Sequence, residues 1–334
     1  MDFFSKHSAS PRIGFMLEIT VDHGVTLQKD GKIILLDPTR MPKRAPSVIV
    51  VSHGHSDHFS LKVLKAYPDV PKIMSRATHE IIDPNKKLRN IVYVEHGETI
   101  EVAGIEFSAY NAGHIIGSLQ FSFNFDGKDF VFTGDFNLEK RLILKPAQIL
   151  KGDVLIVDAT YGSPRYVFPK RSDLYREIVA VAKRFFEEGS PIIFKGRRIG
   201  TAQELVALMN ASVDVLPLVE EVVARHNSVY EMHGEWLGMY AYWNGQPPDM
   251  PLPIIAGLNS RFGGKIPKCI CTGWVKGKLA FPLSSHADYD QIFRYIKESN
   301  ASLVIPFCGF RKELADAVSR ELGIEISYAD KTRI

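Results

Sequence analysis

Four side chains of the kind that bind metals lie within six residues at the end of one apolar run, and no other feature constrains the chain as strongly. The run Ser47–Ser52 has the length and continuous apolar character of a buried strand. Next come His53, His55, Asp57 and His58. Imidazole and carboxylate groups are ligands that zinc prefers, and a spacing of two sends His53 and His55 to the same side of an extended backbone. A polar loop without metal is the alternative, but we predict a metal site.

Two more ligand-type residues stand at strand boundaries further along the chain. His114 lies in the glycine-flanked turn Asn111–Ser118, and Asp135 directly follows an apolar run. The predicted ligands are His53, His55 and His114 for one ion, Asp57 and His58 for a second, and Asp135 as the bridge between them. Two ions about 3.5–4 Å apart can activate a water and stabilise both oxygens of a displacement reaction. We expect Asp37 to orient the histidine loop from behind.

The composition bounds the class of protein. The chain has 334 residues, of which 45% are hydrophobic and 24% charged, with a net charge of +3, as in ordinary globular proteins. Three cysteines make no disulfide framework, which fits a reducing compartment. The first residues lack the apolar core of a signal peptide, and no run approaches 18 apolar residues. We therefore expect a soluble cytoplasmic protein of one or two domains, with no membrane partner.

The order of predicted elements changes near residue 164. Before it, short strands dominate, which we place at Ile13–Val21, Gly31–Leu36, Ser47–Ser52, Ile105–Tyr110, Leu119–Phe125, Asp129–Thr133 and Val154–Val157, with helices at Ser60–Tyr67 and Ala77–Ile82. After it, strands and helices alternate, with helices at Ser172–Glu188 (capped by Ser172), Thr201–Asn210 and Leu216–His226. Residues 244–267 are rich in Pro and Gly and are expected to be loops. The alternation predicts an α/β protein with a parallel unit in its second half.

The motif His-x-His-x-Asp-His, followed by Gly-His114 and Thr-Gly-Asp135, resembles that of the metallo-β-lactamase superfamily. The resemblance implies an αββα sandwich with two metal ions, expected to be zinc, between the sheets. The segments Val157–Pro164, Pro191–Glu204 and Phe281–Tyr289 are similar to motif A, the insert entry and motif B of the β-CASP nucleases. This implies an inserted α/β cap: residues 1–165 would form the first part of the lactamase domain, 166–268 the insert and 269–334 the return.

The β-CASP resemblance also assigns roles. It pairs Asp158 with His286 beside the metals, where a carboxylate holding an imidazole can serve as a general acid; we count both, with Asp57, as catalytic candidates. Alone, each of the pair would be a turn or cap residue. Motif C of RNA-cleaving relatives carries a metal-binding His, but this chain has Cys308 there. Cys308 is either a thiolate ligand or a small buried residue, so the second metal stays open.

Basic residues gather in the predicted insert. Residues 160–200 hold nine basic and four acidic side chains, whereas 211–250 hold one basic and six acidic. Two solvated surfaces would explain this distribution, but cations over the metals would also hold phosphates without reading bases. We expect Arg197, Arg198 and Lys276 to bind substrate, with Arg165, Lys195 and Lys278 nearby. Trp236, Tyr240, Tyr242 and Trp243 would stack on bases or, more simply, pack in the core.

These features together predict a zinc-dependent hydrolase that cleaves phosphodiester bonds in nucleic acid. Length, the Cys271–Trp274 segment and the pattern Leu-Ser-x-His-Ala-Asp are similar to short β-CASP exonucleases associated with DNA ligases, and so favour a DNA exonuclease in repair, with a DNA ligase as possible partner. Gly113–Gly117 and Ala202–Leu205 are equally similar to factors that process RNA 3′ ends, which keeps an RNA-processing ribonuclease as the alternative. A small-molecule hydrolase on the same fold is the third reading. Oligomeric state is left open.

Overall fold

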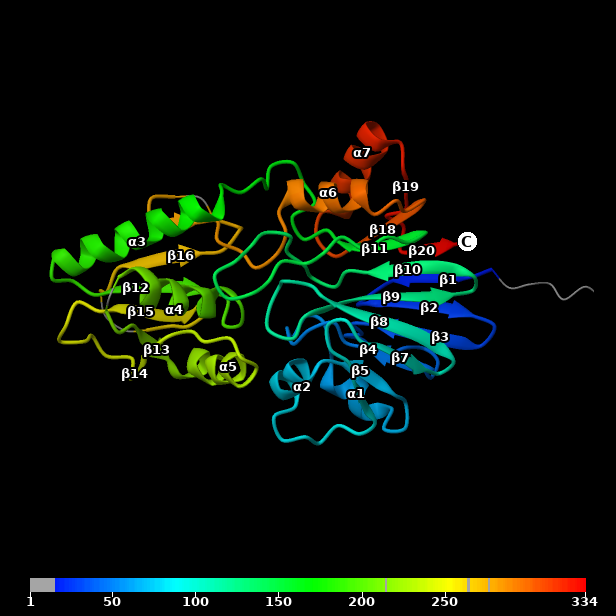
Figure 1. Ribbon diagram of the computed structural model, residues 1–334, viewed down its shortest axis with the longest axis horizontal. Helices are drawn as coiled ribbons and strands as arrows, with labels where there is room; N and C mark the ends of the chain where they lie inside the picture. The colour runs from blue at the N-terminus through cyan, green and yellow to red at the C-terminus, as the bar shows by residue number, and fades with distance from the viewer. Residues whose placement is uncertain (1–15, 214, 263–264, 276) are drawn as a thin grey trace, which may run out of the picture.

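The computed structural model describes residues 16–213, 215–262, 265–275 and 277–334, and it has two lobes (Figure 1). The larger lobe contains two seven-stranded sheets. The first sheet runs, in spatial order, β20 (Lys331–Arg333), β1 (Glu18–Val21), β2 (Val25–Lys29), β3 (Lys32–Leu36), β4 (Val48–Val50), β5 (Lys72–Met74) and β6 (Ile91–Tyr93). The second runs β19 (Glu325–Ile326), β18 (Leu303–Phe307), β11 (Val154–Asp158), β10 (Lys128–Phe132), β9 (Leu119–Phe125), β8 (Ile105–Asn111) and β7 (Thr99–Val102).

The two sheets share one apolar core. Leu27, Ile34 and Val50 of the first sheet belong to the same buried cluster as Phe121 and Phe132 of the second. Alternating apolar residues on β8 and β9 supply the inward face, as a half-buried antiparallel strand requires. Burial of large aromatic side chains there removes much apolar area from water, which is the main stabilising contribution of this layer.

Helices cover the outer face of each sheet. α1 (Leu61–Ala66) and α2 (Arg76–Ile82) pack on the first sheet, and α6 (Tyr289–Glu298) and α7 (Arg311–Leu322) on the second. The layer order is therefore helix, sheet, sheet, helix, and the predicted αββα sandwich is confirmed. No helix of the described ranges is both long enough and apolar enough to cross a bilayer.

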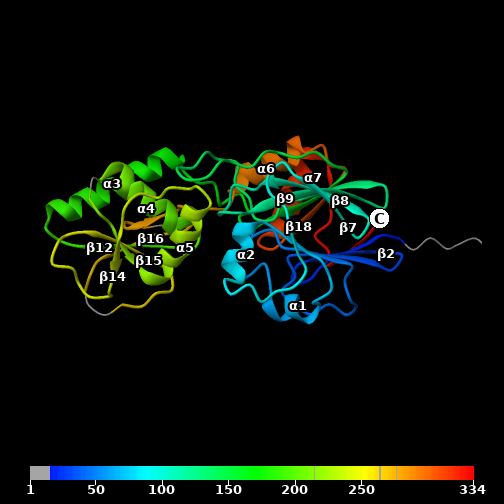
Figure 2. The same cartoon turned by 60° about the horizontal axis from the view of Figure 1, so that its bottom comes forward.

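The smaller lobe is a parallel α/β unit. Its sheet runs β14 (Ala241–Trp243), β13 (Leu218–Glu220), β15 (Pro253–Gly257), β12 (Ile192–Gly196), β16 (Lys268–Cys271) and β17 (Ala280–Phe281), and all named pairs are parallel. α3 (Arg171–Glu187), α4 (Thr201–Ser212) and α5 (Glu221–Met232) pack on it. The same apolar cluster includes Ala77 of α2 and Ile115, so the lobes share a core (Figure 2).

The structure corrects several local predictions. The segment expected as one helix from 216 to 226 is β13 followed by α5, since Leu218–Glu220 pairs with two parallel strands. The expected loop 244–267 contains β15, a buried central strand. Its sequence begins with Pro253 and ends with Gly257, residues that are typical of loops. α3 begins at Arg171 with Lys170 as its N-cap, so Ser172 is inside the helix.

Strand pairing bears on the boundaries of the insert. β16 pairs with β12, and β17 pairs with β16, so both strands belong to the third sheet although they reach beyond residue 268. The chain then returns to the large lobe, where β18 pairs in parallel with β11. The predicted bounds of the insert, 166 and 268, stay a prediction.

Candidate metal centre

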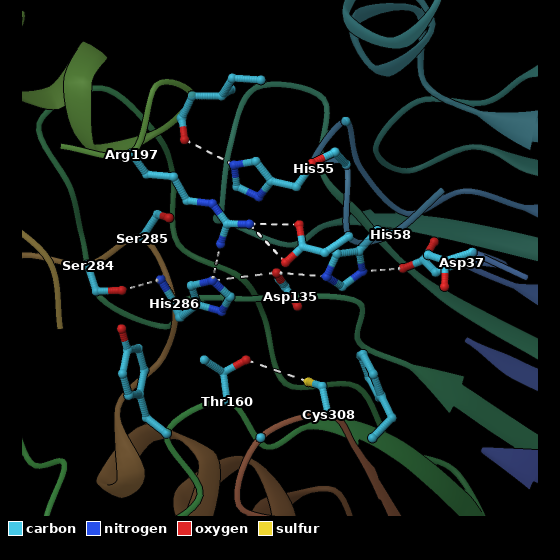
Figure 3. A pocket seen from close by; sticks show the side chains of 18 of the residues that line it. Asp37, His55, His58, Asp135, Thr160, Arg197, Ser284, Ser285, His286 and Cys308 are labelled. Carbon is cyan, nitrogen blue, oxygen red and sulfur yellow. Dashed lines mark hydrogen bonds and ion pairs between the residues drawn. The ribbon is translucent and has the colours of Figure 1, made fainter. Parts of the chain in front are cut away.

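The ligand-type residues gather where the carboxyl ends of several parallel strands meet. Asp37 follows β3, the His53–His58 loop follows β4, Asp135 follows β10, Asp158 ends β11 and Cys308 follows β18. Since the carboxyl ends of neighbouring parallel strands lie at one edge of a sheet, side chains far apart in sequence converge there. Asp37, His55, His58, Asp135 and Cys308 line a cavity of about 1050 Å³, to which the insert contributes Arg197 (Figure 3).

Asp135 is at the centre of this arrangement. Its Oδ2 lies 3.3 Å from Nε2 of His53, 3.2 Å from Nε2 of His58, 3.4 Å from Nε2 of His114 and 3.6 Å from Nε2 of His286. The carboxylate is fully buried, and neither oxygen has a hydrogen-bond partner among the described residues. Four imidazoles around one carboxylate oxygen give the geometry expected of a bridging position.

The outer nitrogen of each ligand-type histidine is held in place. His53 Nδ1 lies 2.9 Å from Ser52 Oγ, and His58 Nδ1 lies 2.8 Å from Asp37 Oδ2. His55 Nε2 lies 3.0 Å from the Ile199 carbonyl oxygen, and His114 Nδ1 lies 3.0 Å from that of Ser285. A carbonyl or carboxylate oxygen only accepts, so each ring facing one donates from its outer nitrogen and turns its other nitrogen inward. Such outer partners are typical of metal-binding histidines.

A cation fits the space that these inner nitrogens enclose. His55 Nδ1 lies 3.1 Å from His53 Nε2 and 2.9 Å from His114 Nε2. With the outer nitrogens protonated, all three inner nitrogens are acceptors. None of them can therefore donate a hydrogen bond to another. Together with Asp135 they form a buried four-ligand group of the kind that holds a divalent metal. The chemistry of the donor set therefore fits the metal that the sequence predicts.

The surroundings shift the pKa of these groups in opposite directions. Burial, aided by positive charge on Arg197 and His286 respectively, holds the pKa of His55 and His114 well below the usual value. Burial also opposes ionisation of Asp135, but the neighbouring imidazoles hold its pKa well below the usual range. Burial lowers the pKa of His58, but the carboxylates of Asp135 and Asp37 outweigh burial and hold this pKa well above its usual value. The three inner nitrogens of the His53, His55 and His114 group are thus ready to act as neutral ligands.

The residues expected at the second metal are less uniform. His58 joins a potential ligand group with Asp37 and His53, and Asp135, Asp158 and His286 form another. The Asp57 side chain lies apart from these groups: it is 59% exposed and makes an ion pair of 2.7 Å with Arg197. Its role as a ligand stays a prediction, and this geometry supports a role in holding Arg197.

Asp158 and His286 meet as the motif resemblance implies. His286 Nδ1 donates to Asp158 Oδ2 at 3.1 Å, which turns Nε2 toward Asp135 and toward Arg197 Nη1, 3.2 Å away. The other oxygen of Asp158 accepts from the Thr160 backbone at 2.7 Å and from Cys308 Sγ at 3.1 Å. This carboxylate is fully buried, so its hydrogen bonds fix the imidazole beside the metal position.

Cys308 lines the cavity but bonds to Asp158, and its Sγ belongs to none of the ligand groups found among the described residues. Desolvation and the charges of Asp158 and Asp135 hold the pKa of its thiol well above the usual value. The residue has a left-handed backbone with φ of 53° and is exposed in the loop after β18. This exposure argues against the small buried residue, and the role of Cys308 as a ligand stays a prediction.

The expected substrate-binding cations divide in two. Arg197 and Arg198 line the cavity, opposite the histidines, whereas Lys276 lies outside the described residues. Arg311 also lines the cavity and was missed, because nothing in its local sequence distinguishes it from other helix-start residues. Ser52 and the carbonyls of Ile199 and Ser285 were missed as well; backbone carbonyls leave no signal in a sequence.

Comparison with known proteins agrees with this geometry. Residues 22–163 match the family described as the β-lactamase superfamily domain. The chain is 29% identical to an RNase J-like protein of Methanocaldococcus jannaschii over 69% of its own length and 61% of the relative's. It is 27% identical to a probable DNA ligase of Opitutus terrae over 92% of its own length and 30% of the relative's. Thus it spans less than two thirds of either relative.

A solved structure shows the same fold. A protein of unknown function from Enterococcus faecalis V583 superposes with a TM-score of 0.62 over 96% of this chain and all of that chain, at 13% identity. The sandwich, the histidine cluster and the central aspartate define a protein of the metallo-β-lactamase class. Within that class, the similarity to proteins named RNase J-like, RNase aCSPSF2 and cleavage and polyadenylation specificity factor 73 agrees with the predicted β-CASP nuclease family.

Proposed function

We propose that this protein is a zinc-dependent nuclease that hydrolyses phosphodiester bonds, acting as an exonuclease on DNA. The observation that carries the proposal is the convergence of His53, His55 and His114 on Asp135, beside the Asp158–His286 pair, in a cavity that the insert closes with arginines. Bound divalent ions would supply Lewis acidity toward a phosphoryl oxygen and a water nucleophile at neutral pH. His53, His55, His114 and Asp135 would hold the first, and His58 with Asp135 would contribute to the second.

The chain's own residues then handle charge and protons. Arg197 is 35% exposed and directs Nη1 and Nη2 into the cavity, where it is placed to hold a nonbridging phosphate oxygen. Asp158 holds the Nδ1 proton of His286 and so turns Nε2 toward the reacting centre. Protonated on both nitrogens at the start of the step, His286 can give its Nε2 proton to the leaving oxygen and becomes neutral, with its Nδ1 proton still held by Asp158.

The choice of DNA rests on two observations. The match to the DNA ligase-named relative extends over 92% of this chain, against 69% for the RNase J-like relative. Position 308 is Cys, where the resemblance to RNA-cleaving β-CASP proteins implies a His. The alternative is an RNA-processing ribonuclease, because the chain is also similar to proteins named RNase J-like and RNase aCSPSF2. A DNA ligase or repair factor is the expected partner, and the cytoplasm the expected location.

A paired cleavage assay tests the proposal. The metal-loaded protein is given single-stranded DNA and RNA of one sequence, labelled at either end, with and without chelator. We expect chelator-sensitive shortening of DNA from one end. Preferential cleavage of RNA would move the protein to the RNA-processing branch. Metal binding without cleavage of either, combined with turnover of simple esters or lactones, would replace the proposal with a small-molecule hydrolase.

A further inference from the structure

An exposed tryptophan lies at the mouth of the cavity, next to the catalytic candidates. Trp274 lines the same cavity as His286, and 53% of it is exposed. The residues behind it are aromatic: its ring centroid lies 4.6 Å from Tyr161, 5.3 Å from Tyr166 and 6.2 Å from Phe310. One side of the indole is therefore supported, and solvent reaches the rest of it inside a charged cleft.

The protein fixes the position of this indole. At the preceding Gly273, a Cβ atom would collide with the Tyr161 hydroxyl and lie 2.6 Å from Phe168 Cζ, so only glycine lets the chain approach this closely. Tyr161 is buried, and burial raises its pKa to about 12, so it is a neutral support. Tyr161 also touches His286 edge to face at 5.9 Å. A single ring thus separates Trp274 from the proposed proton donor.

The charges around the indole indicate its ligand. Arg197 and the metal position, which would hold the reacting phosphate, line the same cavity. The Arg165 guanidinium lies 4.6 Å over the Phe310 ring and 5.2 Å over that of Tyr166, and both of these rings pack against Trp274. An exposed aromatic face with cationic side chains near it suits a nucleic-acid strand, in which each base adjoins a phosphate. Stacking of a base on an aromatic side chain contributes about 1–3 kcal/mol.

We propose that Trp274 forms a stacking subsite for one unpaired nucleobase next to the scissile phosphate, so that the enzyme engages single-stranded ends. This inference rests on the proposed nuclease function and specifies its substrate. A base paired inside a duplex has no free face at this position. Trp236, 73% exposed, does not line the cavity and therefore offers a matched control.

Binding to phosphorothioate oligothymidylate, whose linkages resist cleavage, is measured on the metal-loaded full chain and tests the subsite. We expect Trp274→Ala to weaken binding about 5- to 150-fold, as loss of one stacked base implies. Trp274→Phe should keep affinity within about 3-fold of the unchanged protein because it restores a stacking face. Trp236→Ala should leave affinity unchanged. In a Trp236→Phe background, oligothymidylate should quench the fluorescence of Trp274, since the remaining Trp243 is buried.

An abasic scan gives the decisive result. A single abasic position is moved along the oligonucleotide, and the affinity is measured for each position. The unchanged protein should bind more weakly at one abasic position, and Trp274→Ala should show no such loss of affinity at that position. In cleavage assays the same variant should raise KM with little change in kcat. Equal affinity of Trp274→Ala and the unchanged protein, or a scan profile that the variant does not alter, would overturn the subsite alone. Failure of the unchanged protein to bind or cleave any oligonucleotide would overturn the nuclease proposal too.

Discussion

At the scale of single residues, Asp135 makes the most contacts with the other predicted site residues. One of its oxygens faces four imidazole nitrogens at 3.2–3.6 Å. Asp135→Asn keeps the shape but replaces the anionic oxygen with a neutral amide. We expect metal content to fall and phosphodiester cleavage to drop by more than about 100-fold, because even partners outside the ligand shell are worth 10- to 100-fold. Metal content by mass spectrometry and initial rates check this prediction.

The control for Asp135→Asn is a carboxylate of the same lobe that faces solvent. Asp316 of α7 forms an exposed ion pair with Lys312, and Asp316→Asn should leave both metal content and rate unchanged. Full activity of Asp135→Asn at normal metal content would contradict the assignment of Asp135 as the bridge. The far-ultraviolet circular dichroism spectrum should be the same in all three proteins.

Cys308 gives a second prediction at this scale, concerning reactivity. Its thiol pKa is raised by desolvation and by the nearby carboxylates, and only the thiolate is alkylated. In metal-free protein at pH 8 we expect Cys308 to react with iodoacetamide at least about 10-fold more slowly than a small thiol, and faster as pH rises above 9. Asp158→Asn should accelerate the reaction, because it removes a negative charge that disfavours the thiolate. Peptide mass spectrometry follows the modification.

The histidine cluster shows what local spacing can and cannot predict. His53, His55 and His58 were placed together from their spacing after one apolar run, and the structure brings all three to Asp135. The position of the Asp57 side chain could not follow from spacing, because it is decided by Arg197, 140 residues away. The same is true of the contacts that hold His55 and His114, which come from backbone carbonyls of distant loops.

At the scale of elements, the buried carboxylate of α4 connects helices and loops of both lobes. Glu204 forms ion pairs with Arg141 at 2.6 Å and Arg171 at 2.7 Å, and all three side chains are buried. Arg141 also donates to the carbonyl oxygen of Gly113, beside the His114 loop, and Arg171 to that of Ser284 at 2.7 Å. Glu204 thus keeps two site loops in place through two arginines.

Glu204→Gln should destabilise the protein by about 3–5 kcal/mol, because two buried guanidinium groups lose their counter-charge. Burial alone would raise the pKa of Glu204, but the two arginines outweigh it and lower this pKa from 4.5 to about 2. The ionised carboxylate therefore stabilises the fold fully above pH 4.5, and this contribution, about 3 kcal/mol, is lost as the pH falls from 4.5 to 2. Urea unfolding of metal-free protein at pH 7, 4.5 and 3 measures both effects.

A surface glutamate of the neighbouring helix serves as the control. Glu221 pairs with Arg225 on α5, and both side chains are about 70% exposed. Glu221→Gln should change the free energy of unfolding by less than about 0.5 kcal/mol at each pH. If Glu204→Gln behaved like Glu221→Gln, the network would have no role in stability.

Elements differ in how plainly the sequence marks them. The predicted helix at 172–188 is α3 to within one residue at each end, since its apolar residues follow a helical period along 17 positions. By contrast, β13 has only three residues, and β15 begins with Pro253 and ends with Gly257, so neither segment is long enough to show a strand pattern. β13 is a strand because it pairs with β14 and β15, and β15 because it pairs with β12 and β13; this pairing is a property of the third sheet as a whole.

At the scale of the whole molecule, the site is shared between the lobes. The insert supplies the Ile199 carbonyl to His55 and Arg197 to Asp57, and the return segment supplies the Ser285 carbonyl to His114. In metal-free protein three acceptor nitrogens face one another at 2.9–3.1 Å, so at least one ring gains by rotating away, which breaks its outer hydrogen bond. Metal binding and docking of the insert are therefore coupled.

Hydrogen exchange measures this coupling. Removing the metal should accelerate amide exchange in 197–204 and 283–287, where the outer partners lie, while the central strands β12 and β15 keep their protection until global unfolding. Metal at about 100 times its dissociation constant should add about 2.7 kcal/mol to the free energy of unfolding. Adding zinc back should restore the slow exchange of both segments together, because one ion orients His55 and His114 at once. Uniform protection across the insert, or restoration of one segment alone, would mean that metal binding stabilises the lobes without coupling them.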